Sequence, residues 1–236
     1  MKCVILQPSY IPWRGYFHQI QMADVFIFYD DVQYDKHGWR NRNRIKTQHG
    51  SQWLTIPVQS KGCVEDGLLI NAVRVSSPND WAEKHARSIR QSYGRAPHFS
   101  EIWEQVQPHF SRSHDLLADI TIDLTLTLSK ILGLGGRTFL RSSDLQLNGS
   151  KSDRLLEALK QVGATHYISG PSAQSYLDVN LLLEAGITTE FMTYNYPEYP
   201  QLHGPFDPQV SILDLLFMMG TRSGEYIWGP SLEPTL

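Results

Sequence analysis

The chain has 236 residues, of which 41% are hydrophobic, and carries a formal net charge of −3 at pH 7. This length can bury one substantial core, so we expect a single α/β domain over residues 1–236. The slightly negative net charge argues against a surface that binds a long polyanion. No apolar run reaches the roughly 18 residues that a membrane-spanning helix needs. We therefore expect a cytoplasmic protein without a membrane span.

The beginning of the chain has the pattern of a strand, a helix and a second strand. Residues 3–7 and 25–29 are short, continuous apolar runs, which is typical of strands buried on both faces, and residues 15–23 between them can form a helix. Parallel strands joined in this way gather functional groups at their carboxyl ends. We therefore expect a site where residues 7–10 and 30–33 meet.

The loop after the first predicted strand, residues 7–20, carries side chains suited to holding a ligand. Two prolines fix its path, and a glycine permits close backbone approach. It contains neither a GxGxxG motif nor a P-loop. Alternatively, its aromatic residues pack the helix against the sheet and its histidine is a satisfied surface group. The candidates in this loop are Gln7, Tyr10 and Trp13 for substrate binding and His18 for acid–base chemistry.

The segment from Asp30 to Lys46, DDVQYDKHGWRNRNRIK, has the most distinctive composition in the chain. Arginine binds phosphate in a bidentate manner and tryptophan offers a stacking face, so the segment predicts a site for a planar or phosphorylated anion. The alternative is a solvated strand. In an extended chain, Arg40, Arg42 and Arg44 would share one face and Trp39, Asn41 and Asn43 the other. The candidate substrate-binding residues are Gln33, Trp39, Arg40, Asn41, Arg42 and Lys46.

Two adjacent carboxylates, Asp30 and Asp31, follow the second predicted strand. Adjacent strand residues point to opposite sides, so at most one of them faces a given site, where it could act as a general base. Alternatively, both end the strand and pair with local arginines. Such carboxylates could also hold Mg²⁺ beside phosphates.

The two cysteines, Cys3 and Cys63, are not spaced as a metal-binding pair. Cys3 lies in a predicted buried strand, where a free thiol behaves as a small hydrophobic group. We therefore expect neither a disulfide nor zinc, and no bound organic cofactor.

The rest of the chain alternates between strand and helix patterns around a helical middle. Residues 78–134 predict either helices that cover the sheet or a small helical subdomain. The fold class is α/β, with a parallel or mostly parallel sheet, flanking helices and this helical insertion. The predicted strands are 53–58, 68–75, 138–141, 166–169 and 189–194, and the predicted helices are 80–93, 100–110, 115–132, 152–162, 175–185 and 212–219.

A second group of candidates follows the strand predicted at 166–169. The sequence SGPS places small hydroxyls and a glycine before a helix, which suits an anion held by backbone N–H groups, although a plain capped turn would use the same residues. The candidates are Ser169, Gly170 and Tyr176. The loop at 194–206, rich in Tyr and Pro, could close over a substrate, whereas residues 211–214 indicate the cap of the last helix.

Motifs along almost the whole chain resemble the WbqC-like protein family. They run from Gln7 to Gly220 and include QPSYIPWRGYF, YDDVQY, WRNRNRIK, YISGPSAQSYLD and SILDLLFMMG. The resemblance implies a setting in O-antigen or lipopolysaccharide biosynthesis, or other surface-polysaccharide assembly, and a glycine-transferase activity has been proposed for the family. It supplies no catalytic residues.

These observations lead to a hypothesis of a cytoplasmic group transferase. It would move an aminoacyl or acyl group from a phosphate-containing donor, or an aminoacyl-tRNA, to a nucleotide-linked sugar or related metabolite. The alternatives are a non-catalytic module that binds RNA, tRNA or a nucleotide, and a scaffold of a polysaccharide-assembly complex.

Overall fold

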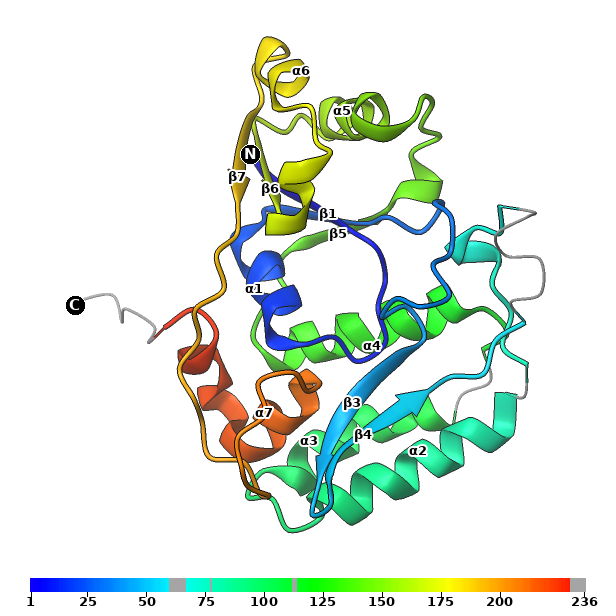
Figure 1. The fold of residues 1–236 in the computed structure, drawn as a ribbon, viewed down its shortest axis with the longest axis vertical. Helices are drawn as coiled ribbons and strands as arrows, with labels where there is room; N and C mark the ends of the chain where they lie inside the picture. Colours follow the sequence, from blue (N-terminus) through cyan, green and yellow to red (C-terminus); the bar gives the residue numbers. More distant parts are fainter. Residues whose placement is uncertain (60–66, 77, 112–113, 230–236) are drawn as a thin grey trace.

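The computed structural model describes residues 1–59, 67–76, 78–111 and 114–229 and contains a parallel five-stranded sheet (Figure 1). All neighbouring strands of this sheet run in the same direction. The α/β fold class is therefore confirmed. The strands are β1 (Lys2–Leu6), β2 (Val25–Phe28), β5 (Thr138–Arg141), β6 (His166–Ser169) and β7 (Thr188–Phe191), in the order β5-β2-β1-β6-β7.

Helices cover both faces of the sheet, which explains why its central strands are apolar on both sides (Figure 1). Successive residues of β1 enter different hydrophobic clusters, with Val4 in one and Cys3 and Ile5 in the other. Cys3 is a buried free thiol, and its burial raises its pKa to about 12; Cys63 lies outside the described residues. The helices that flank the sheet are α1 (Arg14–Met22) and α4 (Leu117–Ile131) on one face and α5 (Lys151–Gln161) and α6 (Val179–Glu184) on the other.

The middle of the chain adds a second layer beside α1 and α4. It contains an antiparallel hairpin, β3 (Arg42–Thr47) and β4 (Gly50–Thr55), which packs on α2 (Pro78–Tyr93). The helix α3 (Phe99–Val106) packs against α4 and against α7 (Ile212–Met219). One continuous hydrophobic cluster joins this layer to the sheet through α1 and α4.

Several predicted elements differ from those observed. The strand predicted at 68–75 is absent; the chain there makes isolated bridges around the 3₁₀ helix Ile70–Ala72. The predicted strand 53–58 is found as β4, displaced toward the hairpin turn. The helix predicted at 100–110 divides into α3 and a 3₁₀ turn that contains Pro108, which has no N–H for an α-helical hydrogen bond.

The helix predicted at 175–185 is also shorter than expected. Residues Pro171–Ser175 form a 3₁₀ turn, and α6 starts only at Val179. Asp178 sets this start because its carboxylate accepts the backbone N–H of Leu181 at 3.1 Å. None of the helices in the described ranges has the combination of length and apolar sequence needed to cross a bilayer.

The order of the strands defines where a ligand site is expected. From β1 the chain moves to β2 and then β5 on one side, and later returns to place β6 and β7 on the other side. Open α/β sheets bind ligands beside the carboxyl ends of the two strands at which this reversal occurs. In this fold those strands are β1 and β6, which end next to Gln7 and Gly170.

Candidate functional site

Asp30 lies at the carboxyl end of β2 and is completely buried. Its carboxylate accepts hydrogen bonds from the backbone N–H of Ser143 at 3.1 Å and from the Ser143 hydroxyl at 3.0 Å, and it lies 3.2 Å from the Ser142 hydroxyl. These serines directly follow β5. Asp30 therefore joins the ends of two neighbouring strands and has no surface with which to contact a substrate.

Asp31 keeps partial solvent exposure on the same edge of the sheet. Its carboxylate forms an ion pair with Arg154 of α5, and a second guanidinium nitrogen of Arg154 donates to the Leu147 carbonyl at 2.6 Å. The Arg154 guanidinium also lies 6.0 Å from the centre of the Tyr29 ring. Of the two predicted carboxylates, Asp31 is thus the one placed where it can meet a ligand.

The loop after β1 and the segment before β3 lie side by side, as the sequence predicts. The Arg40 guanidinium donates to the carbonyl of Gln7 at 3.1 Å and to the hydroxyl of Ser9 at 2.9 Å, and the Tyr10 N–H donates to the Arg40 carbonyl at 3.1 Å. Gln7 and Arg40 are both partly exposed. The two loops therefore form one continuous surface beside the carboxyl end of β1.

The side chain of Tyr10 is buried in the core beneath this surface. Its ring is fully buried, and its hydroxyl lies 2.8 Å from Nδ1 of His85 on α2. Burial lowers the pKa of His85 to about 4. Tyr10 therefore holds the loop to α2, and its burial argues against the predicted contact with substrate.

Trp13 remains on the surface and packs over the start of α1. A Cβ atom at Gly15 would lie 2.3 Å from the Trp13 indole, so only glycine fits beneath this ring. Trp13 also contacts Tyr194, with ring centres 4.9 Å apart, and the Tyr194 hydroxyl lies 3.7 Å from where a Cβ of Gly170 would be. This packing connects the loop after β1 to the end of β6.

The outer face of the β3–β4 hairpin carries a group of aromatic and cationic side chains. Trp39 and Trp53 are 44% and 45% exposed, and their ring centres are 5.1 Å apart. The Arg42 and Arg44 guanidinium groups lie 4.9 Å and 5.6 Å from the centre of the Trp53 ring. We call these four residues, Trp39, Arg42, Arg44 and Trp53, the hairpin platform.

Backbone and amide oxygens hold the two arginines of the hairpin platform in place. Arg42 donates to the carbonyls of His37 and Gly38, and Arg44 donates to the carbonyl and the side-chain oxygen of Gln209. Among the residues that the structure describes, no carboxylate forms an ion pair with either guanidinium. The Asp207 carboxylate interacts electrostatically with Arg44 without forming an ion pair, so Arg42 carries the charge that is more available to an anion.

The inner face of the hairpin is buried and structural. Asn41 donates to the Ile56 carbonyl at 2.8 Å, and Asn43 donates to the carbonyls of Tyr10 at 3.1 Å and Ile11 at 2.9 Å. Lys46 is also buried and donates to the Pro205 carbonyl. Asn41 and Lys46, both predicted to bind substrate, thus lie beneath the surface and pair with the backbone, as Asn43 does. Along β3, Lys46 alternates with Arg42 and Arg44, so it is the contact with Pro205 and not the inner face that covers it.

The sequence predicts that residues 39–44 alternate between two faces of a strand, and this is only partly correct. Arg42 and Arg44 share the outer face, and Asn43 lies on the inner one. Trp39, however, was expected beside the asparagines and instead contacts Trp53 on the outer face. The reason is that β3 begins only at Arg42, so the alternation of a strand does not extend back to Trp39 or Arg40.

The candidates after β6 differ in exposure. Ser169 is buried and its hydroxyl lies 3.3 Å from the Tyr167 hydroxyl, whereas Gly170 is partly exposed and Tyr176 is 69% exposed. Gln33, on the loop after β2, is exposed and bridges to Leu69. Gly170 is therefore the predicted residue that lies next to Gln7 at the reversal point of the sheet.

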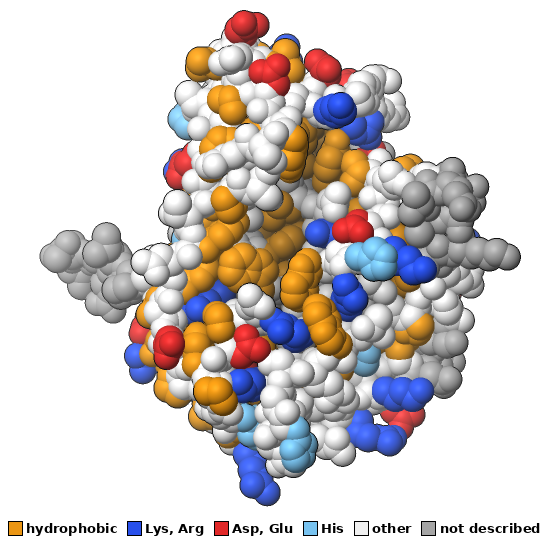
Figure 2. Space-filling view, in the orientation of Figure 1, with side chains coloured by type: hydrophobic (Ala, Val, Ile, Leu, Met, Phe, Trp, Pro, Cys, Tyr) orange, Lys and Arg blue, Asp and Glu red, His pale blue; other side chains and the backbone are white. Residues whose placement is uncertain are grey.

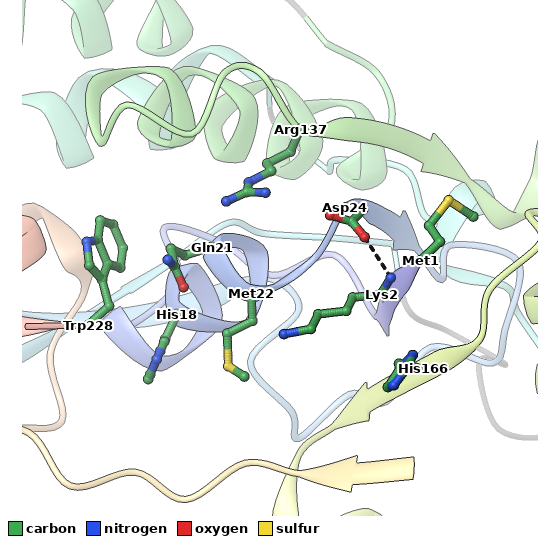
Figure 3. Close-up of a pocket in the computed structure, with 9 residues that line it drawn as sticks. All are labelled: Met1, Lys2, His18, Gln21, Met22, Asp24, Arg137, His166 and Trp228. Carbon is green, nitrogen blue, oxygen red and sulfur yellow. Dashed lines mark hydrogen bonds between the residues drawn. The ribbon is translucent and has the colours of Figure 1, made fainter. Parts of the chain in front are cut away.

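His18 does not join this surface. It lines a cavity beside the amino ends of the strands, and its Nδ1 lies 3.0 Å from the Tyr196 hydroxyl (Figure 3). Burial lowers the pKa of His18. The helix α1 runs away from the carboxyl edge, and His18 lies with residues at the amino ends of the strands, on another side of the molecule from Asp31.

Sequence reasoning missed Trp53 as a contributor to this edge and did not link Arg154 to Asp31. Trp53 pairs with Arg44 across the hairpin, and the turn sequence TQHG, followed by an alternating strand, was the signal that could have found it. Arg154 lies in the first turn of α5, and nothing local in the sequence indicates that it reaches Asp31. In the described part of the chain, no three His, Cys, Asp or Glu side chains converge as metal ligands.

The face that carries this edge combines apolar and cationic groups (Figure 2). Hydrophobic side chains gather in its middle, with lysine and arginine side chains among them, and the surface is hollowed between the β6–β7 side and the β3–β4 hairpin. The fold and this face together define a doubly wound α/β protein with a candidate ligand site at the carboxyl edge of its sheet.

Comparison with known proteins places the chain in a family. A model of the WbqC-like protein family matches residues 7–226, and the chain therefore belongs to the WbqC-like protein family. It is also similar to the "Uncharacterized protein Rv1507c" of Mycobacterium tuberculosis (strain ATCC 25618 / H37Rv), with 42% identity over 228 residues. That alignment covers 96% of this chain and 97% of the mycobacterial protein.

Proposed function

We propose that this chain is a group transferase that moves an acyl or aminoacyl group, glycine among the candidates, to a nucleotide-linked sugar or related metabolite. The donor is an activated, phosphate-containing compound or an aminoacyl-tRNA. The setting is the one that the family resemblance implies, the assembly of a surface polysaccharide such as O-antigen.

The observation that carries the proposal is the hairpin platform. Arg42 and Arg44 present guanidinium groups that backbone oxygens orient and that no described carboxylate pairs with, beside two exposed indole rings. Guanidinium groups bind phosphate oxygens, and indole rings stack on a nucleobase or on the apolar face of a sugar. A nucleotide-linked sugar offers both of these partners.

The position of the platform is the second support. Arg40 ties the segment that leads into β3 to Gln7 at the end of β1, so the platform adjoins the reversal point of the sheet. The exposed Tyr176 and the partly exposed Asp31 follow strands of the same edge. A substrate anchored on the hairpin would thus lie with its reactive end near these groups.

In the proposed reaction, an amine or hydroxyl of the acceptor attacks the carbonyl carbon of the activated acyl group. A new C–N or C–O bond forms, and the bond from that carbon to the donor's leaving group breaks. Asp31 takes the proton of the attacking group, and the leaving group departs with the electron pair of the broken bond. Arg42 and Arg44 hold the phosphates throughout.

A thermal-shift screen against sugar nucleotides, nucleotides, coenzyme A esters and aminoacyl-tRNA tests the proposal. We expect a sugar nucleotide to raise the Tm, and we expect Arg42→Ala to lower kcat/KM in the resulting assay while the protein stays folded. Arg87→Ala, which removes an exposed arginine from α2, is the matched control. No stabilisation by any sugar nucleotide, or equal kinetics of Arg42→Ala and the wild type, would contradict the proposal.

The same platform also favours a second candidate, a module that binds single-stranded RNA or tRNA without catalysis. Exposed aromatic rings with adjacent arginines are the usual means of stacking successive bases. Salt dependence separates the two candidates, because RNA binding dominated by phosphates loses affinity steeply between low and moderate salt. Binding of one sugar nucleotide would lose far less.

A further inference from the structure

The cavity that contains His18 lies at the opposite edge of the sheet from the hairpin platform. Its volume is about 700 Å³, within the range of small-molecule sites. The amino ends of the strands build one wall of it, through Lys2 of β1 and His166 of β6. Gln21 and Met22 come from the last turn of α1 (Figure 3).

The charges in this cavity are mostly positive. Lys2 and Arg137 line it together with two histidines, whereas Asp24 is the only acidic residue among the described residues that line it. The Asp24 carboxylate already accepts the backbone N–H of Lys2 at 2.8 Å. An anion that enters the cavity would therefore meet more positive than negative charge.

The two permanent cations of the cavity have no side-chain partner among the residues that the structure describes. The side chains of Lys2 and Arg137 make no hydrogen bond and no ion pair with any residue that the structure describes. Both reach from the ends of strands toward the side where α1 ends (Figure 3). A bound anion would supply the partners that these two groups lack.

The remaining wall is apolar and has a fixed geometry. Trp228 packs over Gly224, where an added Cβ would lie 2.9 Å from the indole, and its backbone N–H donates to the Gly224 carbonyl at 2.9 Å. Met22, from the last turn of α1, also lines the cavity. This wall suits the ring of an organic ligand.

We propose that this cavity is a second ligand site, which binds a small phosphate ester carrying a ring. Arg137 and Lys2 hold the phosphate, and Trp228 and Met22 contact the ring. The site is separate from the carboxyl edge and does not rest on the proposed transferase activity. A ligand bound there would act as an effector of the protein or as a stored second substrate.

Calorimetric titration of the full chain with inorganic pyrophosphate and with uridine monophosphate tests this site. We expect both probes to bind saturably, and we expect Arg137→Gln and Lys2→Gln each to weaken both by about tenfold. Arg95→Gln, which changes an exposed arginine outside both proposed sites, should leave both affinities unchanged, and the binding that depends on Arg137 should persist in Arg42→Gln. Because the side chains of Arg137 and Lys2 have no described protein partner, these variants should keep the wild-type Tm.

Three results would overturn the proposal. One is that neither probe binds saturably. Another is that Arg95→Gln loses as much affinity as Arg137→Gln, which would indicate general charge attraction. The third is that Arg42→Gln abolishes binding while Arg137→Gln does not. This result would show that the anion binds at the hairpin platform.

Trp228→Leu tests the orientation of the ligand. It should weaken uridine monophosphate several-fold and leave pyrophosphate unchanged, because only the nucleotide has a ring to contact the indole. Equal loss of both probes, or loss of neither, would contradict the assigned orientation.

Discussion

The inner and outer faces of the β3–β4 hairpin use similar polar residues in opposite ways. On the inner face, Asn41 and Asn43 are buried and saturate backbone carbonyls of neighbouring loops. On the outer face, Arg42 and Arg44 lie against an exposed indole and form no ion pair with a described carboxylate. Polar groups that are buried and paired define the fold, whereas oriented, unpaired charges at the surface are available to a ligand.

The adjacent residues Asp30 and Asp31 show the same contrast between a buried and a partly exposed polar group. Asp30 is buried and holds two strand ends together, whereas Asp31 is partly exposed and pairs with one arginine. Substitutions of buried residues should therefore change stability, and substitutions of outer residues should change binding.

The largest effect on stability should come from Asp30→Ala. It leaves the Ser143 N–H and hydroxyl without their acceptor inside the protein, which costs roughly 3–4 kcal/mol of unfolding free energy. Asp31→Ala breaks an ion pair that keeps only slight solvent exposure and removes the acceptor of the Ser142 hydroxyl, so it should cost about 2 kcal/mol. Urea denaturation of both variants measures the difference, and equal losses would remove the distinction between the two carboxylates.

The second effect is a pH dependence that originates at His85. Since burial depresses its folded-state pKa from 6.5 to about 4, the unfolded chain binds a proton first as the pH falls. The contribution of His85 to the free energy of unfolding is fully present above pH 6.5. It declines by roughly 3 kcal/mol as the pH falls to 4. His85→Gln should remove this decline from denaturation curves measured across that range.

Tyr10→Phe is the matched control for the histidine. It removes the hydroxyl that contacts His85 but leaves the imidazole buried, so the decline between pH 6.5 and 4 should remain. If Tyr10→Phe abolished the decline as His85→Gln does, the hydrogen bond and not burial would be its cause.

An intermediate effect is expected for Asn43→Ala on the inner face of the hairpin. The substitution leaves the carbonyls of Tyr10 and Ile11 unpaired in the core and should cost about 2 kcal/mol. Asn43→Asp would retain the size of the side chain but not the donor, and should cost at least as much. A loss below about 0.5 kcal/mol for Asn43→Ala, measured by urea denaturation, would show that water replaces the amide.

The smallest effect on stability should follow Trp53→Ala on the outer face. Nearly half of this side chain is exposed, so the expected loss is below about 1 kcal/mol. Binding should respond in the opposite way, with a loss of about tenfold in affinity for a sugar nucleotide. A variant with wild-type affinity but a large loss of stability would assign Trp53 to the fold.

The sequence was sufficient to predict the sheet and the edge at which the loops meet. Apolar runs mark the central strands, and the carboxyl ends of β1 and β2 bring Gln7 close to Arg40. It could not distinguish Asp30 from Asp31, because the serines that bury Asp30 follow β5, more than 100 residues later. The position of Trp39 depends on where β3 begins, which residue alternation does not reveal.

The position of His18 has a different cause. A helix rises about 1.5 Å per residue, so His18 lies about 6 Å along α1 from its first residue, and its side chain lines the cavity at the amino ends of the strands. The direction of a crossover helix follows from the two strands that it joins. The predicted strands alone were therefore enough to separate His18 from the aspartates.

The central claim is that a substrate binds on the outer face of the hairpin. Calorimetric titration of the wild type, Arg42→Ala/Trp53→Ala and Arg95→Gln with a sugar nucleotide that stabilises the wild type tests it most directly. We expect a loss of about tenfold or more in the hairpin variant and unchanged affinity in Arg95→Gln, which changes an exposed arginine outside both proposed sites. Unchanged affinity in the hairpin variant, with its fold intact, would contradict the account.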